Sequence, residues 1–123
     1  MAERTLTMTI QPDWRRALRF AGQAAQAETY QGETLNFETP AACFGRLTQR
    51  RWALIDALLG AGELPIRGLA RRVRRDVKRV HEDVVVLAEL GIVERTAQGG
   101  VICPYAEIRI DVRLKPSTIV DLP

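Results

Sequence analysis

A dense run of arginine and lysine is the chemically most distinctive feature of this 123-residue chain. From Arg71 to Arg79, six of nine side chains are positively charged and one is negative. The wider segment 48–83 carries nine basic and five acidic residues, whereas the segments on either side are neutral or slightly negative. A basic stripe confined to one short segment indicates a polyanionic partner. The alternative is an ordinary solvated helix face.

Enzymatic and metal-dependent chemistry have no comparable signal. The single histidine, His81, and the two cysteines, Cys43 and Cys103, form no cluster with metal-ligand spacing and no disulfide framework. The sequence also lacks a nucleophile–base arrangement and a glycine-rich phosphate loop. We therefore expect a non-enzymatic protein that uses no cofactor and no metal. The reduced cysteines favour a cytoplasmic location, and without a long apolar run we expect no membrane partner.

Helical periodicity places the basic run across a turn between two helices. Pro65 opens a helix that extends to Val73, because proline suits the first helical turn. Asp76 caps a longer helix over Val77–Leu90. Arg74-Arg75 then forms the turn. The apolar residues of each helix recur at helical spacing and predict one buried face; they are Ile66, Leu69, Ala70 and Val73 in the first helix and Val77, Val80, Val84, Leu87 and Ala88 in the second.

The order of the surrounding elements is typical of a winged helix-turn-helix. An amphipathic helix capped by Thr48 precedes the pair, and two β-like runs flank Gln98-Gly99-Gly100, which predicts a hairpin. In this motif one helix braces against the DNA backbone, the next enters the major groove, and the hairpin reaches an adjacent groove or phosphates. Here Pro65–Val73 is the predicted bracing helix, Val77–Leu90 the predicted reading helix, and the hairpin the predicted wing.

These positions predict which side chains contact DNA. Lys78 and Arg79 lie in the first turn of the reading helix, where side chains meet base edges, and the arginines before them lie where phosphates pass. Glu82, one turn later, accepts from a cytosine amino group or instead forms a helical pair with Lys78 or Arg79. The predicted DNA contacts are Arg67, Arg71, Arg72, Arg74, Arg75, Lys78, Arg79 and Glu82, with Gln98, Gly99 and Gly100 in the wing.

Neighbouring side chains have structural roles in this interpretation. We expect Asp83 to pair with Arg79 or with an arginine of the turn, unless it is simply exposed. His81 is expected to form a structural hydrogen bond, with a phosphate contact as the alternative. Trp14 and Trp52 lie on apolar helix faces, which favours core packing over base stacking.

The rest of the chain predicts strands and short helices around this unit. Thr5–Ile10 and Glu107–Leu114 alternate polar and apolar residues and read as strands that pair within one chain or across a dimer. The remaining expected elements are a helix from Pro12 to about Ala27, a strand over Thr34–Glu38 and a helix over Ala41–Leu47 capped by Thr39. The predicted fold is therefore α+β, a winged helix-turn-helix core with an N-terminal strand-helix-strand arm and a C-terminal strand. Its expected parts are the arm (1–47, for dimerisation or toxin contact), the DNA-binding domain (48–104), the C-terminal strand (105–115) and a flexible tail (116–123).

Several segments resemble one group of regulators. The block R-D-V-K-R-V-H-E-D-V (75–84), together with Arg51–Ile55, Ile66–Ala70, Leu90–Glu94, Phe37-Glu38-Thr39 and Pro104–Ile108, is similar to MarR-like winged helix-turn-helix transcriptional regulators over most of the chain. The block is fairly specific, whereas the L-A and G-L-V positions alone are weak. The chain departs from the pattern at Pro65 (usually a capping Ser), Gly68 (usually Glu) and Ala106 (usually acidic).

The resemblance implies a prokaryotic transcriptional regulator, and several members are antitoxins encoded beside a small toxin, including toxins of the TumE type. We therefore expect a sequence-specific repressor that binds double-stranded operator DNA, represses its own operon and neutralises a cognate toxin by direct binding. A homodimer is expected because operators with two half-sites need two reading helices. The alternatives are a protein-interaction module with a winged-helix fold and no DNA binding, and an RNA-binding accessory factor.

Overall fold

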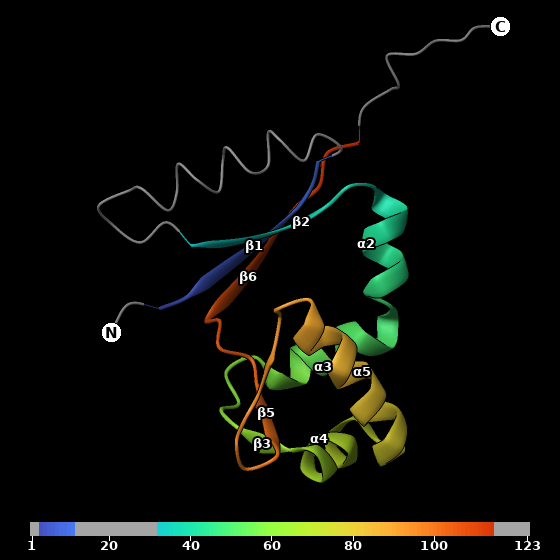
Figure 1. Cartoon of the computed structure of the whole chain (residues 1–123), viewed down its shortest axis with the longest axis vertical. Helices are drawn as coiled ribbons and strands as arrows, with labels where there is room; N and C mark the ends of the chain where they lie inside the picture. Colours follow the sequence, from blue (N-terminus) through green and yellow to red (C-terminus); the bar gives the residue numbers. More distant parts are fainter. Residues whose placement is uncertain (1–2, 12–31, 115–123) are drawn as a thin grey trace, which may run out of the picture.

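The computed structural model describes residues 3–11 and 32–114 (Figure 1). Within them the fold is mixed α+β, with four helices and two three-stranded sheets. The elements are β1 (Thr5–Ile10), β2 (Glu33–Phe37), α2 (Pro40–Arg46), α3 (Gln49–Leu58), β3 (Leu64–Pro65), α4 (Ile66–Val73), α5 (Val77–Glu89), β4 (Glu94–Arg95), β5 (Gly100–Ile102) and β6 (Glu107–Asp111). The expected helix from Pro12 to Ala27, with Trp14, and the expected flexible tail lie outside the described residues.

Side-chain caps set where three of the helices begin, as the sequence predicted. The side-chain oxygens of Thr39, Thr48 and Asp76 accept hydrogen bonds from backbone amides three residues later, at 3.0, 3.4 and 3.3 Å. Each bond satisfies one of the amides that a helix start leaves without a partner. The expected cap positions are therefore confirmed.

Helix α4 begins and ends by different means. Pro65 occupies its N-cap position without a side-chain capping bond, so the helix starts at Ile66, one residue later than expected. A Cβ at Gly68 would lie 3.3 Å from the Pro65 ring, so the two departures from the regulator pattern fit each other. Arg74 ends the helix in the left-handed region, with φ 56° and ψ 50°. This sharp turn directs the chain into α5, which ends at Glu89 with Leu90 as its cap.

The antiparallel sheet has the order β3-β5-β4 and joins the predicted hairpin to the segment before α4. Leu64 pairs with Val101 on one side of β5, and Arg95 pairs with Val101 on the other. Strand β3 was not expected, because a two-residue strand that contains a proline carries no alternation of polar and apolar residues. Its pairing fixes the hairpin against the start of α4.

The parallel sheet has the order β2-β1-β6, so the first strand of the chain lies in its middle (Figure 1). Leu6 pairs with Ile108 and Met8 with Ile110, which confirms that the first and last expected strands pair within one chain. Strand β6 is shorter than expected, ending at Asp111 instead of Leu114. Beyond β1 the amide of Gln11 donates to Phe37 O at the end of β2, and the pairing of β1 with β6 ends at Thr9 and Asp111.

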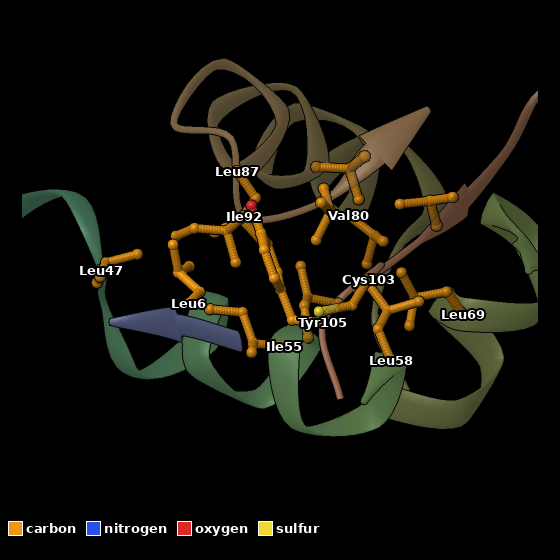
Figure 2. Packing of buried hydrophobic residues seen from close by; sticks show 14 of the residues in the cluster. Leu6, Leu47, Ile55, Leu58, Leu69, Val80, Leu87, Ile92, Cys103 and Tyr105 are labelled. Atoms are coloured by element: carbon orange, nitrogen blue, oxygen red, sulfur yellow. The ribbon is translucent and has the colours of Figure 1, made fainter. Parts of the chain in front are cut away.

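One continuous apolar cluster joins the helices to both sheets (Figure 2). Leu54, Leu58, Leu69, Val80, Val84 and Leu87 from α3, α4 and α5 are fully buried. Leu6, Met8 and Phe37 of the parallel sheet belong to the same cluster, as does Tyr105, whose hydroxyl donates to Gly91 O at 3.1 Å. Trp52 is half-buried and packs against the cluster, in agreement with its expected role in the core. The apolar stripes of α4 and α5 therefore face inward, except at Val77, which was expected in the buried face but is 42% exposed at the first position of α5.

A bilayer-spanning helix would need about 20 apolar residues. Within residues 3–11 and 32–114, no helix has the length and apolar character that this requires.

Candidate nucleic-acid interface

An open groove lies where the starts of α4 and α5 meet the turn between β4 and β5. Its volume is about 740 Å³. The lining residues are Pro65, Ile66 and Arg67 from the start of α4, Asp76, Val77, Lys78 and His81 from the start of α5, and Gly99 from the β4–β5 turn. Three segments between Pro65 and Gly99 that are not adjacent in sequence therefore form one concave surface.

Six of the predicted DNA contacts are exposed cations on α4, α5 and the turn between them, and two of these, Arg67 and Lys78, line the groove. The six are Arg67, Arg71, Arg72, Arg74, Lys78 and Arg79. Arg67 and Arg71 are one helical turn apart and lie on the same face of α4. None of the six forms an ion pair with another residue of the described ranges. Their charge is therefore not neutralised by acidic partners in this part of the chain.

Arg75 does not join this exposed set. Its side chain is only 17% exposed, and its Nη2 donates to Asp83 Oδ2 at 2.7 Å. Asp83 Oδ1 also accepts from Arg51 Nε of α3 at 3.0 Å. The expected pairing of Asp83 with an arginine of the turn is thus confirmed, with Arg51 as a second partner. Because the left-handed Arg74 turns the chain back toward α5, Arg75 faces Asp83 instead of solvent.

The charge of Asp83 is held by these two arginines. Burial alone would raise the pKa of its carboxyl, but hydrogen bonds and charge from Arg75 and Arg51 outweigh that effect, so the pKa lies below its ordinary value. Asp83 is therefore ionised at neutral pH. The resulting bridge connects α3, the α4–α5 turn and α5, and it holds the start of α5 in place relative to the other helices.

The three predicted wing residues separate into two groups. Gln98 and Gly99 are exposed in the turn, and Gly99 has a φ of 84° that favours glycine. Gly100 is buried and is the first residue of β5, paired with Pro65. A Cβ there would lie 2.8 Å from Glu63 Oε2 and 3.0 Å from Leu64 O. Gly100 therefore permits close strand packing, and of the three predicted wing residues only Gln98 and Gly99 are exposed.

His81 forms a hydrogen bond with Arg95 of β4, a residue that the sequence-based set did not include. The distance from Arg95 Nη2 to His81 Nε2 is 3.2 Å. An arginine only donates, so this bond needs a neutral imidazole with its proton on Nδ1. The expected structural hydrogen bond of His81 is confirmed. Arg95 is exposed beside the groove, and its place four residues before Gly99 was the available sequence signal.

Glu82 is exposed on α5 and forms no ion pair with any described residue. The helical pair with Lys78 or Arg79 is therefore not formed.

Burial raises the pKa of both thiols, Cys43 and Cys103, so both stay protonated. Among the described residues, no group of three or more histidine, cysteine or acidic side chains is placed to hold a metal ion.

A family model matches part of the chain. A search of curated proteins found no match to the chain. The family model HVO_A0114 matches residues 46–110, just over half of the chain. The matched region runs from the last residue of α2 into β6, and it includes all three segments that line the groove. On this match, the chain belongs to the HVO_A0114 family.

Proposed function

We propose that this protein is a sequence-specific DNA-binding transcriptional regulator with a winged helix-turn-helix core. In the proposal α5 is the reading helix, α4 braces against the DNA backbone, and the β4–β5 turn is the wing. The observation that carries it is the groove, lined by Arg67 and Lys78, together with four further exposed cations on α4, α5 and the turn between them, none of which has an acidic partner among the described residues.

The dimensions of α5 suit the major groove. Thirteen residues make a helix about 20 Å long and about 10–12 Å wide with its side chains. The major groove of B-DNA is about 12 Å wide and admits one such helix. Lys78 and Arg79 lie in the first turn, where the reading helix meets base edges, and they donate to guanine O6 and N7.

The arginines of α4 supply the sequence-independent part of binding. Arg67, Arg71, Arg72 and Arg74 precede the reading helix and lie where the backbone of the same duplex passes. Arg95 and Gln98 extend this surface to the wing. Glu82 is the one acidic side chain of the predicted set, and because it is exposed and has no ion-pair partner among the described residues, it remains available to a cytosine amino group.

The proposal includes a homodimer that acts as a repressor of its own operon. Two reading helices about one DNA turn apart match an operator with two half-sites. The proposal also includes neutralisation of a toxin by direct contact, which rests on the resemblance to antitoxins among the MarR-like regulators. The exposed apolar side chains Ile110 and Leu114, at 54% and 77%, offer contact area outside the DNA-binding surface.

Paired variants test the reading helix. We expect Lys78→Ala/Arg79→Ala to lower affinity for a labelled duplex from the DNA upstream of the gene by about 100-fold, as two base-contacting side chains are each worth about 1–3 kcal/mol. Arg109→Ala/Arg113→Ala removes the same charge from exposed positions on and beyond β6 and serves as the control. Fluorescence anisotropy measures both. Equal affinity of the two variants rejects α5 as the reading helix, and no binding by the wild type favours a protein-interaction module.

A further inference from the structure

Val77 is an apolar side chain in an unusual place. It is the first residue of α5 and is 42% exposed, whereas Val80 and Val84 of the same helix are fully buried. A β-branched residue gains nothing from an exposed helical position, because its χ1 freedom is restricted there. Packing within the described chain therefore does not account for this valine.

Val77 lines the groove together with other apolar side chains. Pro65 and Ile66 line the same surface, and so do the cations Arg67 and Lys78. Asp76 also lines it, with its carboxylate accepting a hydrogen bond from the Arg79 amide as the cap of α5. An apolar strip between exposed cations fits a ligand that presents a methyl group within a polyanionic frame. A duplex fits this description, because thymine alone among the four bases carries a methyl group in the major groove.

We propose that Val77 contacts the 5-methyl group of a thymine and sets a preference for thymine at one position of each half-site. This inference rests on the proposed function, and it adds a base identity that the charged side chains do not specify. Lys78 and Arg79 donate hydrogen bonds to guanine, whereas Val77 makes an apolar contact. The neighbouring Ile66 and Pro65 extend the apolar surface against which the methyl group packs.

The test removes the methyl group from the DNA and its partner from the protein. Duplexes that bind the full chain are first selected from a random library. Each thymine of the selected site is then replaced by deoxyuridine, which lacks only the methyl group. We expect one thymine in each half-site at which this replacement weakens binding about fourfold, the factor for burying one such group.

The same titration is repeated with Val77→Ala and with the matched control Val85→Ala, a half-buried valine two turns along α5. Circular dichroism verifies that both variants fold. Val77→Ala should bind the thymine duplex more weakly and lose the deoxyuridine effect, whereas Val85→Ala should keep it. A deoxyuridine effect that persists in Val77→Ala, or that occurs at no thymine, overturns this inference alone. Failure to select any duplex overturns the proposed function and this inference together.

Discussion

At the scale of single residues, contact with Asp83 separates Arg75 from the exposed arginines of the basic run. Helical spacing makes Arg79 and Arg75 equal candidates from sequence, since Arg79 is four residues away and Arg75 lies in the preceding turn. The structure selects Arg75, because the positive φ of Arg74 folds the turn back onto α5. A positive φ at a non-glycine residue carries no sequence signal. The sequence therefore predicted that Asp83 pairs with an arginine, but it did not predict which arginine.

The Asp83 bridge predicts a specific loss of stability. Asp83→Asn leaves Arg75 and Arg51, whose side chains are 17% and 21% exposed, without a counter-charge. Arg75 Nη1 already lacks a hydrogen-bond partner within the described ranges. We expect the free energy of unfolding to fall by about 2–3 kcal/mol. The loss is at or below the low end of the range for a fully buried ion pair because both arginines are partly exposed. Denaturant unfolding measures this change in the free energy of unfolding. The control is Asp56→Asn, which changes an exposed carboxylate of α3.

The same bridge should depend on pH in a defined direction. The folded pKa of Asp83 is lowered, so its stabilisation is fully present above the unfolded pKa of about 3.9 and is lost as pH falls through the folded value. The stability difference between wild type and Asp83→Asn should be constant from pH 5 to 7 and shrink below about pH 4. A difference that grows on acidification, or a variant as stable as Asp56→Asn, contradicts the assigned bridge.

At the scale of elements, helix boundaries were the most predictable feature and short strands the least. The sequence predicted the starts of three helices because a capping side chain bonds to an amide within one helical turn. The capping residues are Thr39, Thr48 and Asp76. Strand β3 has two residues, and its proline suggests a helix start, so local sequence could not reveal its pairing with β5. As a result Gly100, which the hairpin pattern assigned to the wing tip, lies in the sheet.

Pro65 and Gly68 should be energetically coupled in α4. Alanine is favoured over glycine in a helix by about 1 kcal/mol, but its Cβ would crowd the Pro65 ring at 3.3 Å. We expect Gly68→Ala to stabilise the Pro65→Ser protein by about 1 kcal/mol and the wild type by clearly less. A double-mutant cycle of thermal unfolding gives the coupling. Equal gains in both backgrounds show that the ring does not restrict position 68.

At the scale of the whole molecule, the parallel sheet shares its core with the helices and is connected to the antiparallel sheet through Arg4. The Arg4 guanidinium bonds to Glu33 of β2 at 2.7 Å and to Glu94 of β4 at 3.3 Å, and it lies 5.0 Å from the centre of the Tyr105 ring. Alternating residues predicted that the first and last strands exist and pair. The central position of β1 and the parallel direction depend on contacts about 100 residues apart, which no local pattern encodes.

The salt dependence of DNA affinity tests the central claim most directly, because the exposed cations of α4 and α5 must displace counterions from phosphates. Each phosphate contact contributes about −0.9 to the slope of log affinity against log salt concentration. If Arg67, Arg71, Arg72 and Arg74 each meet a phosphate, the slope is steeper than about −3 for every bound protomer. Phosphate contacts change affinity strongly between about 50 and 200 mM salt. An anisotropy titration of the upstream duplex over this range should give this slope. A slope near zero contradicts the account.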